Sequence, residues 1–205
     1  MEKKYITLSF DDGPTSDIMS DMLDVLERHG VTASFFLVGN KFDASTEAVV
    51  RRADAMGCDI QNHSFTHSDM SKMDVETIRD EYEKTDALIE KYTGKKAEFF
   101  RPPYISIGGN MYRAIKVPFI CGQGCEDWLP EVTAEQRIER ILNSAEDGQI
   151  VLLHVMEGNG ATVQAVDAVI PELKRRGYEF VNLPELFRIK NVNPDVPSSL
   201  WTTVK

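Results

Sequence analysis

The sequence alternates short apolar runs with amphipathic stretches along most of its length, and this alternation limits the folds open to it. The apolar runs contain four to seven residues and are rich in β-branched and aromatic side chains, which is typical of buried strands. The stretches between them repeat apolar residues at helical spacing and end close to glycines. Strands that alternate with helices form a parallel sheet covered by helices. We therefore expect an α/β fold, either doubly wound or closed into a barrel.

The predicted elements fill most of residues 4–188, which we expect to be one domain. Residues 189–205 have no clear periodicity and are expected to be a C-terminal tail, either packed on the barrel or partly mobile. Strands are predicted at 4–10, 32–38, 58–62, 97–100, 117–121, 149–154 and 178–182. Helices are predicted at 17–29, 43–56, 74–92, 133–146 and 162–176, with Gly30, Gly57, Gly94, Gly148 and Gly177 as their stops.

The charge of the chain excludes some classes of partner. Its 205 residues carry a net charge of −10, whereas nucleic acids and anionic membrane surfaces require basic patches, so we expect neither as a partner. No apolar run approaches the ~20 residues of a membrane helix. No signal peptide precedes the first strand, so we expect a cytoplasmic protein or a domain excised from a longer secreted one. The oligomeric state is left open.

Two aspartates end the first predicted strand, in the segment SFDDGP. Asp-Gly-Pro is ordinary turn chemistry, but His63 and His67, spaced H-x-x-x-H, follow the third strand at the same rim. A catalytic zinc ion usually has three protein ligands and one open position. The two histidines and one of the carboxylates, Asp11 or Asp12, would complete such a set. The other carboxylate would then act as a base on the attacking water.

Further residues at the strand ends fit the same hydrolytic reaction. His154 would donate a proton to the leaving group, and Asp127 would hold its imidazole protonated. Arg101 would hold the base carboxylate in place and keep its pKa low. Trp128 offers an apolar wall for a sugar ring or an acetyl methyl. Each has an ordinary alternative, such as a surface ion pair or a core position, and only their gathering at one rim favours function.

With these motifs the chain resembles the polysaccharide deacetylases of the NodB-homology type, carbohydrate esterase family 4. Five segments occur in the family's order between about residues 4 and 188, namely SFDDGP, HSFTH, RPPY, EDW and LLH. The resemblance implies a distorted (β/α) barrel of about seven parallel strands, the NodB / glycoside hydrolase–deacetylase type. It also implies a divalent metal, zinc ahead of cobalt or nickel, and hydrolysis of acetyl groups on a polysaccharide or oligosaccharide.

The resemblance also assigns roles to individual residues. Asp11 resembles the catalytic base, and Asp12, His63 and His67 resemble the three metal ligands, with Ser64 supporting the histidine loop. Of the others, Arg101 would orient the base, the backbone N–H of Tyr104 would bind the oxyanion, Asp127 would tune the acid His154, and Trp128 and Leu152 would line the acetyl pocket.

One position departs from the family pattern. Gly124 stands where the family usually has an aspartate, so the support around Arg101 and the shape of the loop are expected to differ. The acetylxylan esterases of the family share this departure and resemble stretches such as DWLPEVTAEQRIERIL, which favours removal of O-acetyl groups from xylan. The alternatives are N-deacetylation of chitin oligosaccharides or peptidoglycan N-acetylglucosamine, a non-catalytic carbohydrate-binding pseudo-enzyme, and an amidohydrolase acting on a small metabolite.

Overall fold

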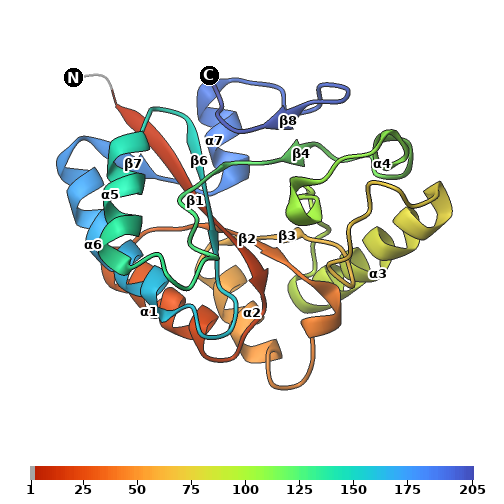
Figure 1. Cartoon of the computed structure of the whole chain (residues 1–205), viewed down its shortest axis with the longest axis horizontal. Helices are drawn as coiled ribbons and strands as arrows, with labels where there is room; N and C mark the ends of the chain where they lie inside the picture. The colour runs from red at the N-terminus through yellow and green to blue at the C-terminus, as the bar shows by residue number, and fades with distance from the viewer. Residues whose placement is uncertain (1–2) are drawn as a thin grey trace.

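A computed structural model of the chain describes residues 3–205 and shows a mostly parallel sheet surrounded by helices (Figure 1). The strands are β1 (Lys4–Gly13), β2 (Ser34–Leu37), β3 (Asp59–Asn62), β4 (Phe119–Ile120), β5 (Gln123–Gly124), β6 (Gln149–His154), β7 (Tyr178–Phe180) and β8 (Leu200–Trp201). The helices are α1 (Ile18–His29), α2 (Glu47–Ala55), α3 (Val75–Thr93), α4 (Gly109–Ala114), α5 (Ala134–Ser144), α6 (Gly160–Arg175) and α7 (Leu183–Lys190), with short 3-10 turns η1 (Gly39–Lys41) and η2 (Pro103–Ile105). The predicted α/β class and distorted barrel are confirmed.

The longest strand, β1, lies inside the sheet, whose order is β3-β2-β1-β6-β5, and β7 pairs with its first residues. Residues 6–10 of β1 are fully buried because the sheet is covered on both faces. Side chains alternate along a strand, so Leu8 and Phe10 join the core beneath the helices. Ser9 and Asp11 therefore point the other way, into the barrel.

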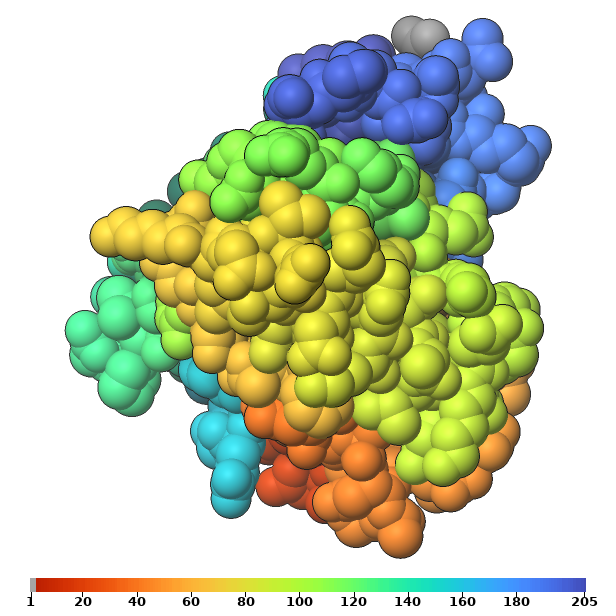
Figure 2. Space-filling view, turned by 90° about the vertical axis from the view of Figure 1, so that its right-hand side faces the viewer, coloured from red at the N-terminus to blue at the C-terminus, as the bar shows by residue number. Residues whose placement is uncertain are grey.

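The C-terminal residues fill the gap between β4 and β6. β8 pairs in parallel with β4, and Thr203 forms an antiparallel bridge with Gln149 at the start of β6. On the other side of β4, Phe100 bridges both Asn62 and Phe119. Figure 2 shows the C-terminal residues, in blue, lying against the green segment that leads into β4. The barrel is thus closed by short bridges rather than a continuous ladder, which is the source of its distortion. The expected tail is packed on the barrel.

Two predicted features are wrong. The strand expected at 97–100 is reduced to the bridge at Phe100, because the side-chain oxygen of Gln61 accepts the backbone N–H groups of Glu98 and Phe99 in place of a neighbouring strand. Gly148 does not end the helix expected at 133–146, since α5 already stops at Ser144. Glycine is required at 148 because φ is +83° and a Cβ would lie 2.0 Å from the carbonyl oxygen of Val204.

Two helices were not expected. α4 has six residues and α7 has eight, which is too short for a periodic pattern to be read. The start of α7 carried a local signal all the same, since the Asn182 side chain caps it and a proline stands in its first turn. Buried Leu183, Leu186 and Phe187 of α7 pack with Val204 of the tail. Within residues 3–205, no helix combines the length and the apolar character needed to cross a membrane.

The carboxyl group of Asp59, at the start of β3, has a raised pKa. It accepts hydrogen bonds from Ser34 Oγ (2.5 Å) and Gln61 Nε2 (2.8 Å), but burial outweighs them and raises the pKa of Asp59 to about 6. The folded protein therefore binds this proton more tightly than the unfolded chain does. Stability contributed by the group is complete below pH 4 and is lost as the pH rises through about 6.

We predict that Asp59→Asn raises the free energy of unfolding at pH 7.5 by about 1–2 kcal/mol, after allowance for partial exposure of the group. At pH 4 the variant and the parent should differ little, because the parent carboxyl group is then protonated. Urea unfolding at both pH values measures the difference. Asp195→Asn, which removes an exposed charge in the tail, serves as the control. An equal change at both pH values would contradict the expectation.

Candidate active site

The adjacent aspartates at the end of β1 reach the same side because the strand bulges between them. The register of β1 with β2 passes from Asp11 opposite Phe36 to Gly13 opposite Leu37, which leaves Asp12 as the extra residue with φ +68°. Aspartate adopts this left-handed conformation more readily than most residues. As a result both carboxylates lie 3.6 Å from the same atom, Nε2 of His63.

Three side-chain atoms that could bind a metal ion converge beside Asp11. Asp12 Oδ1 lies 3.1 Å from His67 Nε2 and 3.6 Å from His63 Nε2, and the three groups offer ligand atoms within 4.8 Å of one another. His63 Nδ1 lies 2.7 Å from the carbonyl oxygen of Arg101, so it donates its N–H there and Nε2 keeps its lone pair. Burial lowers the pKa of His63 to about 3, so the imidazole is neutral. This donor set fits a divalent metal ion.

Two side chains hold the loop that carries His67, and the sequence analysis identified only one of them. Ser64 and His67 both have left-handed backbones, and Ser64 Oγ accepts the N–H of His67 at 3.1 Å, in keeping with its expected support of the loop. Glu81 of α3 was not singled out, yet its carboxylate accepts the N–H of Thr66 at 2.8 Å. A signal was present, because Glu81 stands three residues after buried Ile78 on the same helix face. An acidic residue on an apolar face requires a polar partner.

Arg101 is fully buried inside the barrel and binds Asp11. Its Nη1 donates to Asp11 Oδ1 at 2.5 Å, its Nη2 donates to Ser9 Oγ at 2.8 Å, and its guanidinium lies 4.0 Å from the centroid of the Phe36 ring. The expected contact is present, but the expected low pKa of Asp11 is wrong. Burial raises the pKa of Asp11, and the charge of Arg101 offsets this only in part. A buried carboxylate with a raised pKa accepts a proton more readily than an exposed one.

Asp127 holds His154 at the end of β6. Asp127 is fully buried, its Oδ1 lies 2.8 Å from His154 Nδ1, and its Oδ2 accepts the backbone N–H of His154 at 2.8 Å. Burial by itself lowers the pKa of His154. The hydrogen bond and charge of Asp127, with the charges of Asp11 and Asp12, outweigh that effect and raise the pKa. With Nδ1–H donated to Asp127, Nε2 is the nitrogen left to face a ligand.

The aromatic residues lie on the rim. The Trp128 side chain is 45% exposed and meets the His154 ring edge-on, with centroids 5.6 Å apart. A Cβ added to Gly124 would lie 3.1 Å from the Trp128 ring, so the absence of a side chain there lets the indole lie against β5. Tyr104 is 70% exposed and has φ 57° and ψ 11° within η2, where its ring meets that of His67.

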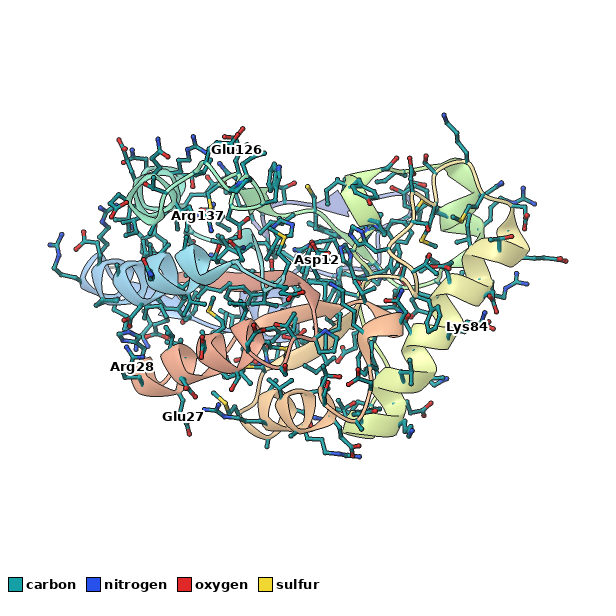
Figure 3. All side chains as sticks on the ribbon, turned by 60° about the horizontal axis from the view of Figure 1, so that its bottom comes forward. Asp12, Glu27, Arg28, Lys84, Glu126 and Arg137 are labelled. Carbon is teal, nitrogen blue, oxygen red and sulfur yellow. The ribbon has the colours of Figure 1, made fainter. Side chains whose placement is uncertain are left out.

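A cavity of about 530 Å³ brings most of the predicted residues together around Asp12, which Figure 3 shows near the centre of the molecule. Arg101 and Asp127 lie behind its wall, against Asp11 and His154. The predicted residues that line the cavity are Asp11, Asp12, His63, His67, Tyr104, Trp128, Leu152 and His154. A metal-binding set, a carboxylate and a hydrogen-bonded imidazole around one cavity provide the groups that hydrolysis of an acyl bond requires.

Comparisons with known proteins agree on one family. Residues 1–117 match the family model described as polysaccharide deacetylase. A bifunctional xylanase/deacetylase from Pseudobutyrivibrio xylanivorans is 45% identical over 203 residues, which are 99% of this chain and 34% of that protein. The chain therefore spans about a third of the length of that relative.

Solved structures extend this similarity over the whole fold. The Xyl-CE4 domain of a multidomain xylanase from the hindgut metagenome of Trinervitermes trinervoides has a TM-score of 0.97 at 44% identity, covering 99% of this chain and 98% of that one. A family 4 acetyl xylan esterase from Clostridium thermocellum, solved with a cobalt ion, has a TM-score of 0.95 at 40% identity, covering 98% and 99%.

Proposed function

Since the chain belongs to the polysaccharide deacetylase family, we propose that it hydrolyses O-acetyl esters of xylan. The observation that carries the proposal is that a carboxylate suited to be the base and an imidazole suited to be the acid line the same cavity. Asp11 and His154 occupy paired positions on β1 and β6, one bound by Arg101 and the other by Asp127. The metal-binding set stands beside Asp11. The similarity to a xylanase/deacetylase and to an acetyl xylan esterase supports xylan as the substrate.

Asp12, His63 and His67 would hold the divalent metal ion, which we propose to be zinc, with cobalt or nickel able to replace it. When bound, such an ion lowers the pKa of water and polarises the acetyl carbonyl. The chain itself contributes the proton transfers. Asp11 Oδ1 already accepts from Arg101, so Oδ2 is the atom free to take a proton from the attacking water.

The other groups act on the acetyl ester. The backbone N–H of Tyr104 would donate to the developing oxyanion, and Trp128 and Leu152 would enclose the acetyl methyl. His154 Nε2 would then give its proton to the leaving sugar oxygen as the carbon–oxygen bond breaks. Acetate and a free hydroxyl group are the products; Asp11 then releases its proton to solvent and His154 takes one up, which restores the starting state. Arg101 and Asp127 act through Asp11 and His154 and are positioning residues in this scheme.

Acetate release tests the proposal. Zinc-loaded protein is incubated with acetylated xylan and, in parallel, with N-acetylated chitin oligosaccharides, and each reaction is repeated with a chelator. We expect chelator-sensitive acetate release from xylan that exceeds release from the chitin oligosaccharides, because an alkoxide leaving group needs less protonation than an amine. Acetate release from the chitin oligosaccharides alone would support metal-dependent deacetylation but contradict xylan as the substrate. Binding of either glycan without any acetate would favour the carbohydrate-binding pseudo-enzyme.

A further inference from the structure

Behind Asp127 lies a buried arginine that the proposed reaction has not used. Arg137, on α5, is 2% exposed and lies between the ribbons of α5 and α6 in Figure 3. Its Nη1 donates to Asn159 Oδ1 at 2.6 Å and to Thr162 Oγ1 at 2.7 Å. Within residues 3–205, it forms no direct ion pair with a carboxylate. Its Nε and Nη2 donate to the carbonyl oxygens of Val132 and Leu129, and Thr162 and Asn159 connect Nη1 to the carboxylate of Asp127.

The hydrogen bonds of Arg137 decide the direction of those that follow. Arginine has only donors, so Thr162 Oγ1 and Asn159 Oδ1 must both accept from it. The hydroxyl hydrogen of Thr162 is then directed to Asp127 Oδ2, 2.9 Å away. The Asn159 amide is likewise held with Nδ2 toward Asp127 Oδ2 (3.3 Å) and the carbonyl oxygen of His154 (2.9 Å).

Asp127 therefore accepts a hydrogen bond from each of these neighbours. Its Oδ2 accepts from Thr162, from Asn159 and from the backbone of His154, while Oδ1 accepts from the His154 ring. Without Arg137 the Thr162 hydroxyl could turn and the Asn159 amide could flip, which would present an acceptor to the carboxylate. The ring contact of His154 would then lose its fixed geometry.

From this chain of contacts we propose that Arg137 is a positioning residue for the proton-donating step, fixing Asp127 as an acceptor and His154 with Nε2 toward the leaving group. The inference rests on the proposed function, because it assigns a task only where a leaving group is protonated. It extends the acid machinery from the cavity wall to α5, through two bridging side chains, Asn159 at the N-cap of α6 and Thr162 in its first turn.

The test compares substrates that differ in their need for an acid. In Arg137→Met we expect kcat on acetylated xylan to fall about 10–100-fold, which is a large part of a typical general-acid contribution. On 4-nitrophenyl acetate, kcat should fall less than about threefold. Nitrophenolate leaves without a proton, whereas a sugar alkoxide does not. Thr162→Val, which removes one bridge and keeps the arginine, should show the same selectivity to a smaller extent. Arg137→Lys should restore part of the xylan activity.

Controls separate positioning from folding. Arg140→Met makes the same substitution one turn along α5, where the arginine is partly exposed and binds Glu126, and should leave the substrate ratio unchanged. Metal affinity, measured by calorimetry, should be unchanged in all variants. Proton NMR of the unreacted protein reports the His154 Nδ1–H directly, and its downfield resonance should weaken in Arg137→Met and Thr162→Val.

An equal loss on both substrates, or parental values in both variants, would overturn the role of Arg137. If the parent protein itself released no acetate, the proposed function would fail. The NMR resonance would still show whether Arg137 orders the contact between His154 and Asp127, because that contact does not depend on turnover.

Discussion

Replacing Asp11 by asparagine should lower kcat for acetate release by about 10³-fold and leave the affinity for a divalent metal ion nearly unchanged. Asparagine cannot take a proton from water, but its side-chain oxygen can still accept the hydrogen bond that Arg101 donates. The buried guanidinium thus keeps a partner and the fold is preserved. Asp11 is not one of the three residues that offer converging metal-binding atoms, so loss of its charge should affect turnover much more than binding.

The neighbouring residue provides the contrast. Asp12→Asn changes the same functional group one position along β1, in a residue whose Oδ1 lies 3.1 Å from His67 Nε2. It should weaken metal binding as well as activity, and excess metal should restore part of the turnover. Calorimetric titration and acetate release on both variants separate the two roles. If Asp11→Asn retained more than about a tenth of the activity, Asp11 would not be the base.

The closeness of the residues at the strand ends could be predicted, because the C-terminal ends of parallel strands meet at one edge of the sheet. β1, β3 and β6 all end at one rim, so Asp12, His63 and His154 had to be close once the alternation of strands and helices was recognised. The bulge at Asp12 could not be predicted in detail, since it depends on how β2 pairs beyond Asp11. The raised pKa of Asp11 was missed for a related reason. Sequence indicates which charges are available, but burial depends on the packed barrel.

Buried polar residues on helices were the larger omission. Glu81 and Arg137 lie on faces that also carry Ile78 and Ile141, so each is a charge at an apolar position. In a sequence such a residue is easily taken for part of the solvated face of its helix. Its partners, Thr66 and Thr162, are polar residues of loops and helix ends whose positions depend on tertiary structure.

Replacing His67 by asparagine should lower the affinity for a divalent metal ion by more than about 100-fold. Mutating a residue that only hydrogen-bonds to a metal ligand already costs about 10–100-fold, and loss of the ligand itself should cost more. Asparagine is chosen because His67 has φ +59°, a conformation that asparagine also adopts readily, so the loop should keep its course. Its amide ends nearer the backbone than an imidazole Nε2 does and cannot reach the same position. His29→Asn is the matched control, because His29 ends α1 and binds Asp167, away from the cavity.

Metal-dependent stability gives this prediction a second measurement. A ligand at 100 times its Kd stabilises the folded state by about 2.7 kcal/mol. Zinc should therefore raise the thermal unfolding temperature of the parent protein and of His29→Asn, but not that of His67→Asn at the same concentration. Loss of activity in His67→Asn with full stabilisation by zinc would show that the metal binds elsewhere. Retention of activity without stabilisation would show that turnover does not depend on metal bound by His67, and the proposed reaction would have to be abandoned.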